Sequence, residues 1–159
     1  MCLILIFVRV GSYEYVSEIV VCNFTEEELR EIWRDTYCHK VIKTHDGIRV
    51  HFYESNFDHA FYESSKRNQS RNKKKSKDIL SSERLSRILW IKDVLEDPTA
   101  TMYVGFDNKT KRYDRTKRVA VVKGNYVVVI QIYAKGKANF ITAYVANNSI
   151  DKIEQGPRW

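Results

Sequence analysis

The sequence predicts an α+β fold, in which an N-terminal β-rich segment and helices pack on a C-terminal four-stranded antiparallel sheet. Three observations support this prediction. Apolar residues recur at helical spacing within residues 57–66 and 82–96. Four β-prone runs follow between residues 101 and 146. The connections between these runs are short, which favours antiparallel pairing of consecutive strands.

The first part of the chain is expected to contain two hairpins. Residues 3–10 and 13–21 are β-prone runs separated by a short turn that contains glycine. Further on, Asp46-Gly47 lies between two more β-prone runs, and this dipeptide is a strong signal for a two-residue hairpin turn.

Three helices are predicted from caps and apolar spacing. Thr25 stands three residues before Glu28, the pattern of a capping box, so the first helix begins there. The second helix is expected over residues 57–66 and the third over residues 82–96, where Pro98 prevents its continuation.

A single domain is expected over residues 1–159, because 43% of the residues are hydrophobic and the length suits one core. Residues 1–53 are a β-rich part with one helix, and residues 54–98 are a helical part. Residues 99–147 form the sheet, and residues 148–159 are a C-terminal tail. The strands of the sheet are expected at residues 101–106, 116–122, 126–133 and 140–146.

The net charge of +7 is concentrated in one segment of the helical part. Ser65–Lys77 carries seven basic residues and no acidic one, so 27 − 7 = 20 basic residues outside it balance the 20 acidic ones. The segment lacks apolar periodicity, which predicts a mobile loop over residues 65–78. A second basic cluster spans residues 107–118. Two positive patches on a neutral body favour an anionic partner, nucleic acid before a membrane.

Several functional classes lack their sequence signals. No GxSxG, P-loop, GxGxxG or HExxH motif is present. Three cysteines without CxxC spacing argue against a disulfide framework and a thiolate zinc site, and favour the cytoplasm. His39, His45 and His51 match no zinc pattern. The opening apolar run is too short to cross a bilayer. We therefore expect no metal, no cofactor and no membrane partner.

Strict alternation in the last strand separates an aliphatic face, expected under the helices, from a face with hydroxyl groups and rings. The aliphatic face consists of Ile141, Ala143 and Val145. The face with hydroxyl groups and rings consists of Phe140, Thr142 and Tyr144. The second face fits a wet concave site and an ordinary solvated surface equally well.

Metal-free RNA cleavage is the reaction that such residues could perform. The 2′-OH of the substrate is the nucleophile, so the protein supplies a proton acceptor, a proton donor and positive charge. Histidine suits proton transfer near neutral pH, and His59 is expected on a polar stripe of the second helix with Lys66. A lone helical histidine is, on its own, more often structural than catalytic.

Four short motifs resemble the phage branch of the barnase/EndoU/colicin/RelE-like (BECR) nuclease superfamily. They are FDHAFYE (57–63), ERLSRILWIKDVLEDP (83–98), NFITAYVAN (139–147) and GPRW (156–159), and the resemblance covers roughly residues 49–159. It implies helices before a four-stranded antiparallel sheet and a metal-independent endoribonuclease.

The resemblance implies a catalytic set of His59, Thr142 and Tyr144. His59 would be the general acid or base, and Tyr144 its partner or a base-stacking residue. The barnase-type arrangement has a carboxylate base and a histidine acid, whereas no acidic residue is evident on the Thr142 face. Cations from the two basic clusters and the helices are expected to bind phosphate or RNA: Lys66, Arg67, Arg84, Lys111, Arg112, Arg115, Lys117 and Arg118.

The leading hypothesis is a toxin-like or phage-derived endoribonuclease in the cytoplasm of a bacterial or phage-infected cell. It would cleave tRNA or another RNA, and a cognate inhibitor or antitoxin protein is an expected partner. The alternative is a non-catalytic nucleic-acid-binding protein, or a phage-encoded inhibitor or regulator of a host system. A partner-binding protein with a degenerate nuclease fold is a third hypothesis.

Overall fold

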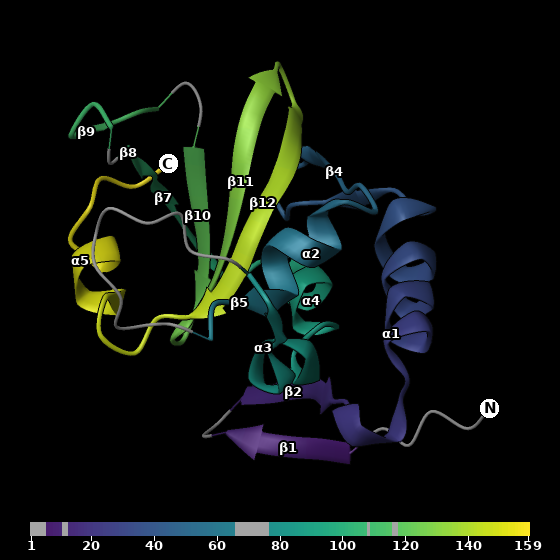
Figure 1. Ribbon diagram of the computed structural model, residues 1–159. Coiled ribbons are helices and arrows are strands. Elements are labelled where there is room, and N and C mark those ends of the chain that lie inside the picture. Colours follow the sequence, from purple (N-terminus) through teal and green to yellow (C-terminus); the bar gives the residue numbers. More distant parts are fainter. Residues whose placement is uncertain (1–5, 11–12, 66–76, 108, 116–117) are drawn as a thin grey trace.

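The computed structural model describes residues 6–10, 13–65, 77–107, 109–115 and 118–159. The described part has an α+β fold built on one six-stranded sheet with the strand order β3-β4-β12-β11-β10-β7 (Figure 1). These strands are β3 (Ile42–Lys43), β4 (Arg49–His51), β7 (Thr101–Val104), β10 (Arg118–Lys123), β11 (Tyr126–Ala134) and β12 (Lys137–Val145).

The four predicted C-terminal strands are part of this larger sheet. Strands β7, β10, β11 and β12 pair antiparallel with their neighbours, as expected. The number of strands differs from the prediction, because β4 joins β12 in parallel and β3 continues the sheet beyond β4. Both come from the hairpin predicted at Asp46-Gly47, where Gly47 has a φ of 94°. A hairpin signal shows that two strands pair, but it does not show which sheet they join.

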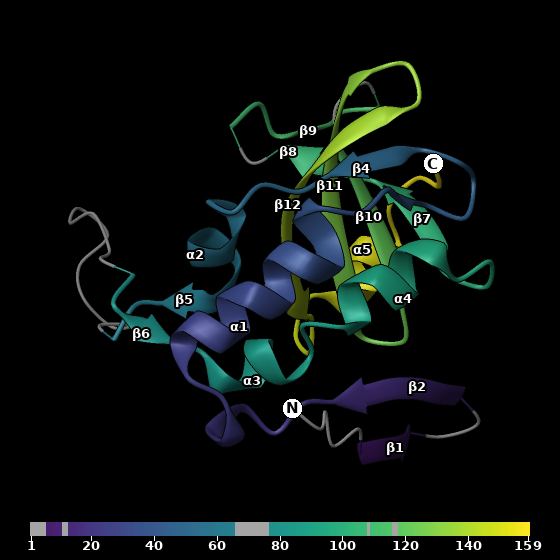
Figure 2. The same ribbon diagram turned by 90° about the vertical axis from the view of Figure 1, so that its right-hand side faces the viewer.

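Helices cover both faces of the sheet. Helices α1 to α4 lie on one face, and α5 lies on the other (Figures 1 and 2). Their bounds are α1 (Glu26–Trp33), α2 (Asn56–Phe61), α3 (Ser82–Ser86), α4 (Trp90–Glu96) and α5 (Ile150–Glu154). A 3-10 turn (Val21–Asn23) precedes α1 and a π-helical turn (Arg34–Cys38) follows it. The predicted capping box at Thr25 and Glu28 is confirmed.

The first hairpin lies apart from the central sheet. Strands β1 (Ile6–Val10) and β2 (Tyr13–Glu18) pair antiparallel, as predicted, and form a separate ribbon next to α3 (Figures 1 and 2). The chain then joins the body, where the backbone N–H of Ile19 donates to the carbonyl of Ser86 over 2.9 Å.

The helix predicted over residues 57–66 ends at Phe61. Tyr62 adopts an extended conformation, and β5 (Tyr62–Glu63) pairs with β6 (Ile79–Leu80) instead. The hydroxyl of Tyr62 donates to Glu26 of α1 over 2.8 Å, which favours the extended chain over another helical turn. The predicted polar stripe of His59 and Lys66 on one helix is therefore wrong. Lys66 and most of the predicted basic loop, residues 66–76, lie outside the described residues.

The helix predicted over residues 82–96 is two helices separated by a turn. The hydroxyl of Tyr37 donates to the carbonyl of Ile88 over 2.5 Å and accepts from the N–H of Lys92 over 3.1 Å. In an uninterrupted helix these two backbone groups would bond to each other. Insertion of a side chain into the backbone ladder is a known cause of a helix break. Sequence periodicity carries no information about a tyrosine that lies 51 residues away.

A β-bulge in β12 assigns its side chains to the two faces. Val129 pairs with Thr142 and Ile130 with Phe140, so Ile141 is an extra residue. Phe140 consequently belongs to the main core and is 1% exposed, stacked on Phe52 at 5.0 Å. The strict alternation predicted for residues 140–145 is therefore wrong at Phe140 and Ile141, which exchange faces.

The C-terminal residues extend the structure rather than forming a tail. Ile150 and Ile153 of α5 pack on a second core cluster that includes Val127 and Tyr103. Beyond α5, the N–H of Val104 donates to Pro157 over 2.8 Å and that of Trp159 donates to Met102 over 3.0 Å, so the chain lines the outer edge of β7. A helix of five residues is too short to produce a detectable apolar period. Within the described residues, no helix is long and apolar enough to cross a membrane.

Gly105 permits the close approach of two strands, and this contact is testable. A Cβ at Gly105 would overlap the Cβ of Arg118, and the N–H of Gly105 donates to the Arg118 carbonyl over 2.8 Å. Gly105→Ala is expected to lower the free energy of unfolding by about 1–3 kcal/mol, measured by urea denaturation. The same change in an Arg118→Gly background should cost less, because the opposing Cβ is gone. Equal costs in both backgrounds would contradict this explanation.

Candidate functional site

A cleft of about 710 Å³ lies on the α5 face of the sheet. Its floor is formed by β10, β11 and β12, and α5 forms one wall. The opposite wall is a small hairpin of β8 (Phe106–Asp107) and β9 (Arg112–Tyr113), which lies on the same side of the sheet as α5 (Figure 1). We call this cavity the sheet cleft.

The sheet cleft has an aliphatic base with polar and aromatic side chains around it. The aliphatic residues are Val104, Ala120, Val129, Ile141 and Ile153. The others are cations, hydroxyl groups and exposed rings: Arg118 and Lys152, then Thr142, Tyr144 and Ser149, then Phe106 and Tyr113. None of the described residues that line it is Asp or Glu. Such a cleft attracts an anion and offers it hydrogen-bond donors.

The bulge in β12 supplies part of this lining. It directs Ile141 and Thr142 together into the sheet cleft, where Thr142 lies opposite Val129 of β11. Tyr144 lies opposite Val127 on the same face and packs on the second core cluster. The predicted proximity of Thr142 and Tyr144 on one face is therefore found.

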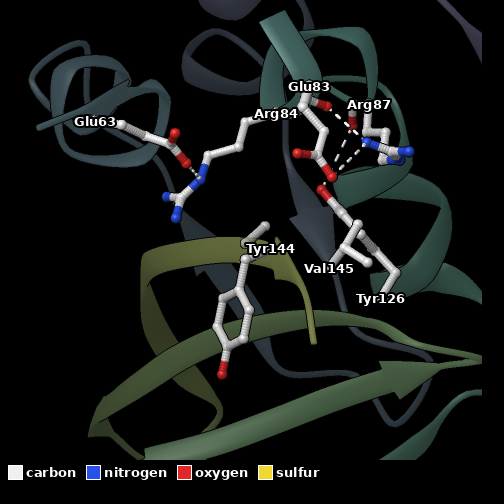
Figure 3. Close-up of a pocket in the computed structure, with 8 residues that line it drawn as sticks. Glu63, Glu83, Arg84, Arg87, Tyr126, Tyr144 and Val145 are labelled. Atoms are coloured by element: carbon white, nitrogen blue, oxygen red, sulfur yellow. Dashed lines mark hydrogen bonds and ion pairs between the residues drawn. The ribbon is translucent and has the colours of Figure 1, made fainter. Parts of the chain in front are cut away.

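Tyr144 also borders a second, smaller pocket of about 240 Å³. Figure 3 shows that its ring leads away from Arg84, with the hydroxyl directed away from the Arg84–Glu63 pair. Burial raises the pKa of Tyr144, and the charge of Arg84 lowers it to a lesser extent. Because the net shift is upward, the hydroxyl keeps its proton at neutral pH and can act as a donor.

The smaller pocket, which we call the edge pocket, contains paired charges. Arg84 Nε lies 2.9 Å from a carboxylate oxygen of Glu63 (Figure 3). A second guanidinium nitrogen of Arg84 donates to the carbonyl of Ala60 over 3.0 Å. Arg87 lies 3.4 Å from Glu18 and 3.7 Å from Glu83. These arginines are paired with carboxylates inside the pocket. In the sheet cleft the described lining has no acid, although Arg118 contributes to lowering the pKa of Asp107 nearby.

His59 lies near the end of α2, with an exposed side chain. Lys77 Nζ is 3.4 Å from His59 Nδ1 and also donates to the His59 carbonyl oxygen. Partial burial of the ring, followed by the charges of Lys77 and Arg84, lowers the pKa of His59 below its ordinary value of 6.5. The neutral imidazole therefore predominates at pH 7 and can accept a proton.

The predicted residues are distributed over both sites. Thr142, Tyr144 and Arg118 line the sheet cleft, and Arg84 and Tyr144 line the edge pocket, whereas His59 lines neither cavity. The exposed cations of the hairpin region lie beside the sheet cleft: Lys111, Arg112 and Arg115. Lys66, Arg67 and Lys117 are outside the described residues.

Several site residues were not predicted from the sequence. Lys152 belongs to a helix that gave no periodic signal, and Glu63 was predicted on a helix that ends before it. Phe106 and Tyr113 did carry a signal, because aromatic residues within the basic cluster of residues 107–118 and directly before it are typical of a surface that stacks on bases.

Metal binding has no candidate centre in the part of the chain that the structure describes. There, no group of three or more His, Cys, Asp or Glu side chains is placed to hold an ion. His39 lies 3.7 Å from Asp35, and the ring of His51 contacts that of Tyr133 at 5.9 Å. The three histidines without a predicted role therefore do not converge with acids or thiols on a common centre among these residues.

Comparison with known proteins finds no match for the chain among protein-family models, curated proteins or solved structures. The resemblance to the BECR superfamily is thus neither supported nor opposed by known relatives. Any function has to be argued from the cleft and its side chains.

The microenvironment of His59 can be measured directly by NMR titration of its ring resonances. Lys77→Gln removes a nearby positive charge, so we expect the pKa of His59 to rise toward 6.5. Lys92→Gln is the matched control, because Lys92 pairs with Glu96 on α4. Because the folded-state pKa is below that of the unfolded chain, the free energy of unfolding falls on acidification below pH 6.5. A His59 titration that is identical in wild type and Lys77→Gln would contradict this account.

Proposed function

We propose that the protein is a metal-independent endoribonuclease that uses the sheet cleft and resembles the BECR superfamily. The observation that supports this best is a cleft that combines two cations, two β12 hydroxyl groups and exposed rings without an acid among its described lining. A phosphodiester with an attached base matches these three kinds of side chain.

The reaction in this proposal needs only protein side chains and the substrate. The 2′-oxygen attacks phosphorus, the bond from phosphorus to the 5′-oxygen breaks, and a 2′,3′-cyclic phosphate and a 5′-hydroxyl result. Arg118 and Lys152 would stabilise the charge on the phosphorane, and Thr142 would donate to a phosphate oxygen. Tyr144, whose raised pKa keeps its proton, would protonate the leaving oxygen.

His59 is proposed as the acceptor of the 2′-OH proton. The charge of Arg84 acts on the pKa of both His59 and Tyr144. Because His59 lies on α2 and lines neither cavity, the substrate would have to extend from the sheet cleft past the Arg84–Glu63 pair to reach it. In-line displacement requires acceptor and donor on opposite sides of phosphorus. This requirement agrees with a Tyr144 hydroxyl that points away from Arg84 (Figure 3).

Glu63 is the second candidate for the acceptor. The barnase-type arrangement has a carboxylate base, and Glu63 places a carboxylate in the edge pocket that Tyr144 also borders. Its ion pair with Arg84 would have to open, or share its charge with the substrate, before the carboxylate could take a proton. We therefore prefer His59. The activities of His59→Ala and Glu63→Gln distinguish the two assignments.

The substrate and setting follow from the same proposal. A nuclease of this kind would act on tRNA or another RNA in the cytoplasm of a bacterial or phage-infected cell, and a cognate inhibitor or antitoxin would protect the host. The exposed cations near the cleft favour an acidic inhibitor surface as well as RNA.

The cleavage test uses purified protein and total RNA in excess EDTA. We expect cleavage that leaves 2′,3′-cyclic phosphate ends, and a fall in rate of about 100-fold or more in His59→Ala and Tyr144→Phe, the range for loss of a general acid or base. His39→Ala and Tyr53→Phe are matched controls at exposed positions outside the cleft lining.

The outcomes separate the candidate functions. Full activity in His59→Ala but not in Glu63→Gln would assign the proton acceptor to Glu63. RNA binding without cleavage in EDTA would overturn the nuclease and support the non-catalytic nucleic-acid-binding alternative.

The pH dependence of cleavage tests the role of His59 independently. A proton acceptor has to be neutral, so kcat/KM should fall as the pH drops through the lowered pKa of His59. Lys77→Gln raises that pKa, so the acidic limb should move to higher pH, while Lys92→Gln leaves it in place. A limb that does not respond to Lys77→Gln would show that another group accepts the proton.

A further inference from the structure

Two aromatic side chains stand exposed at the mouth of the sheet cleft. Phe106 and Tyr113 pair across the β8–β9 hairpin, and their rings meet edge to face at a centroid distance of 5.3 Å. They are 43% and 47% exposed, although both line the cleft. Because the two rings touch each other on one hairpin, they form a joint apolar surface beside the cations of the cleft, and such a surface suits contact with a ligand.

The rings are held in place by the backbone around them. Tyr113 packs against the C-terminal segment, where a Cβ added to Gly156 would lie 3.1 Å from the Tyr113 ring. Phe106 follows Gly105, whose backbone is fixed against Arg118. The two rings are therefore held together on one wall of the cleft, and this preorganisation lowers the entropic cost of binding a planar ligand.

The surroundings of the two rings are cationic. Lys109, Lys111, Arg112 and Arg115 are exposed in the same segment. The nearby acid Asp107 accepts the backbone N–H of Lys109 over 2.8 Å, which fixes the turn. Lys111 has a φ of 55°, a conformation that glycine adopts more easily.

We propose that Phe106 and Tyr113 form a base-stacking subsite that makes the sheet cleft bind single-stranded nucleic acid in preference to duplex. The base would stack on a ring, and the attached phosphates would lie along the hairpin cations and Arg118. A duplex hides the faces of its bases, so only a single-stranded segment can fill such a subsite. The inference rests on nucleic-acid binding at the proposed active cleft, but it does not require cleavage.

A protein partner explains the subsite less well. Protein–protein interfaces are depleted of lysine, whereas Lys152 lines the sheet cleft and Lys109 and Lys111 are exposed beside the two rings. The arrangement of rings among Lys and Arg matches the way in which non-sequence-specific proteins hold single strands.

The experiment measures the binding of a fluorescently labelled single-stranded DNA by anisotropy. DNA lacks the 2′-OH, so it cannot be cleaved by the proposed reaction, and binding is measured whether or not the protein is a nuclease. Phe106→Leu and Tyr113→Leu should each raise Kd about fivefold or more, the range for loss of one stacked base. Phe106→Tyr and Tyr113→Phe keep the rings and should bind like wild type.

The controls separate stacking from charge and from misfolding. Tyr53→Leu removes an equally exposed ring outside the cleft lining and should leave Kd unchanged. Lys111→Gly removes a charge at a backbone position that glycine tolerates, so the protein should still fold. Its affinity for single-stranded DNA and for duplex should fall by the same factor.

Two results would overturn the inference. One is equal affinity of wild type and both leucine variants for the single strand, and the other is equal affinity of wild type for single strand and duplex of the same sequence. Failure of RNA cleavage in EDTA, with binding lost in the leucine variants, would contradict only the nuclease. Cleavage with unchanged binding in those variants would contradict only the stacking subsite.

Discussion

The extra residue in β12 is the constraint on which the candidate site depends. Phe140 of β12 pairs with Ile130 of β11, and Thr142 pairs with Val129. Ile141 therefore has no partner on β11. Without this bulge, Phe140 and Thr142 would share a face, and burying the ring under the helices would take the hydroxyl group with it. With it, Phe140 completes the aromatic core around Trp33, at a centroid distance of 5.5 Å, while Thr142 and Tyr144 line the sheet cleft.

The hydroxyl of Tyr37 has a comparable role on the helix side. It occupies the position of the missing bond between Ile88 and Lys92 and thereby ends α3 early. Arg84 of α3 and Arg87 at its C-terminal end line the edge pocket, whereas Ile88 and Ile91 lie in the main core. A buried tyrosine thus satisfies the backbone groups that the turn exposes, which limits the cost of breaking the helix.

Much of the fold is evident in the sequence, because local signals govern it. The Thr25 capping box, the Asp46-Gly47 turn and the four C-terminal β-prone runs each depend on neighbouring residues. The errors come from distant contacts: Tyr37 in the helix ladder, Tyr62 bonded to Glu26, and β4 added to β12 in parallel. These contacts connect residues far apart in the chain, and periodicity carries no information about them.

For the site, pattern predicted two side chains but not their surroundings. Alternation predicted Thr142 and Tyr144 on one face. The alternation is interrupted at Ile141, but this bulge comes before both residues, so they still share a face. Lys152 could not be predicted, since five helical residues give no period and its position depends on α5 packing through Ile150 and Ile153. The walls of the cleft are thus tertiary features, while its floor follows from strand pattern.

The two cavities beside Tyr144 differ in a way that decides which of them suits a phosphate. In the edge pocket, Arg84 and Arg87 already pair with Glu63, Glu83 and Glu18, so an incoming phosphate would have to displace carboxylates. In the sheet cleft, no described lining residue is a carboxylate, and the acid on which Arg118 acts, Asp107, lies outside the lining. The arginine pairs are partly exposed, and each contributes little to stability. Their larger effect is to withdraw positive charge from the edge pocket and leave the attraction for an anion to the cleft.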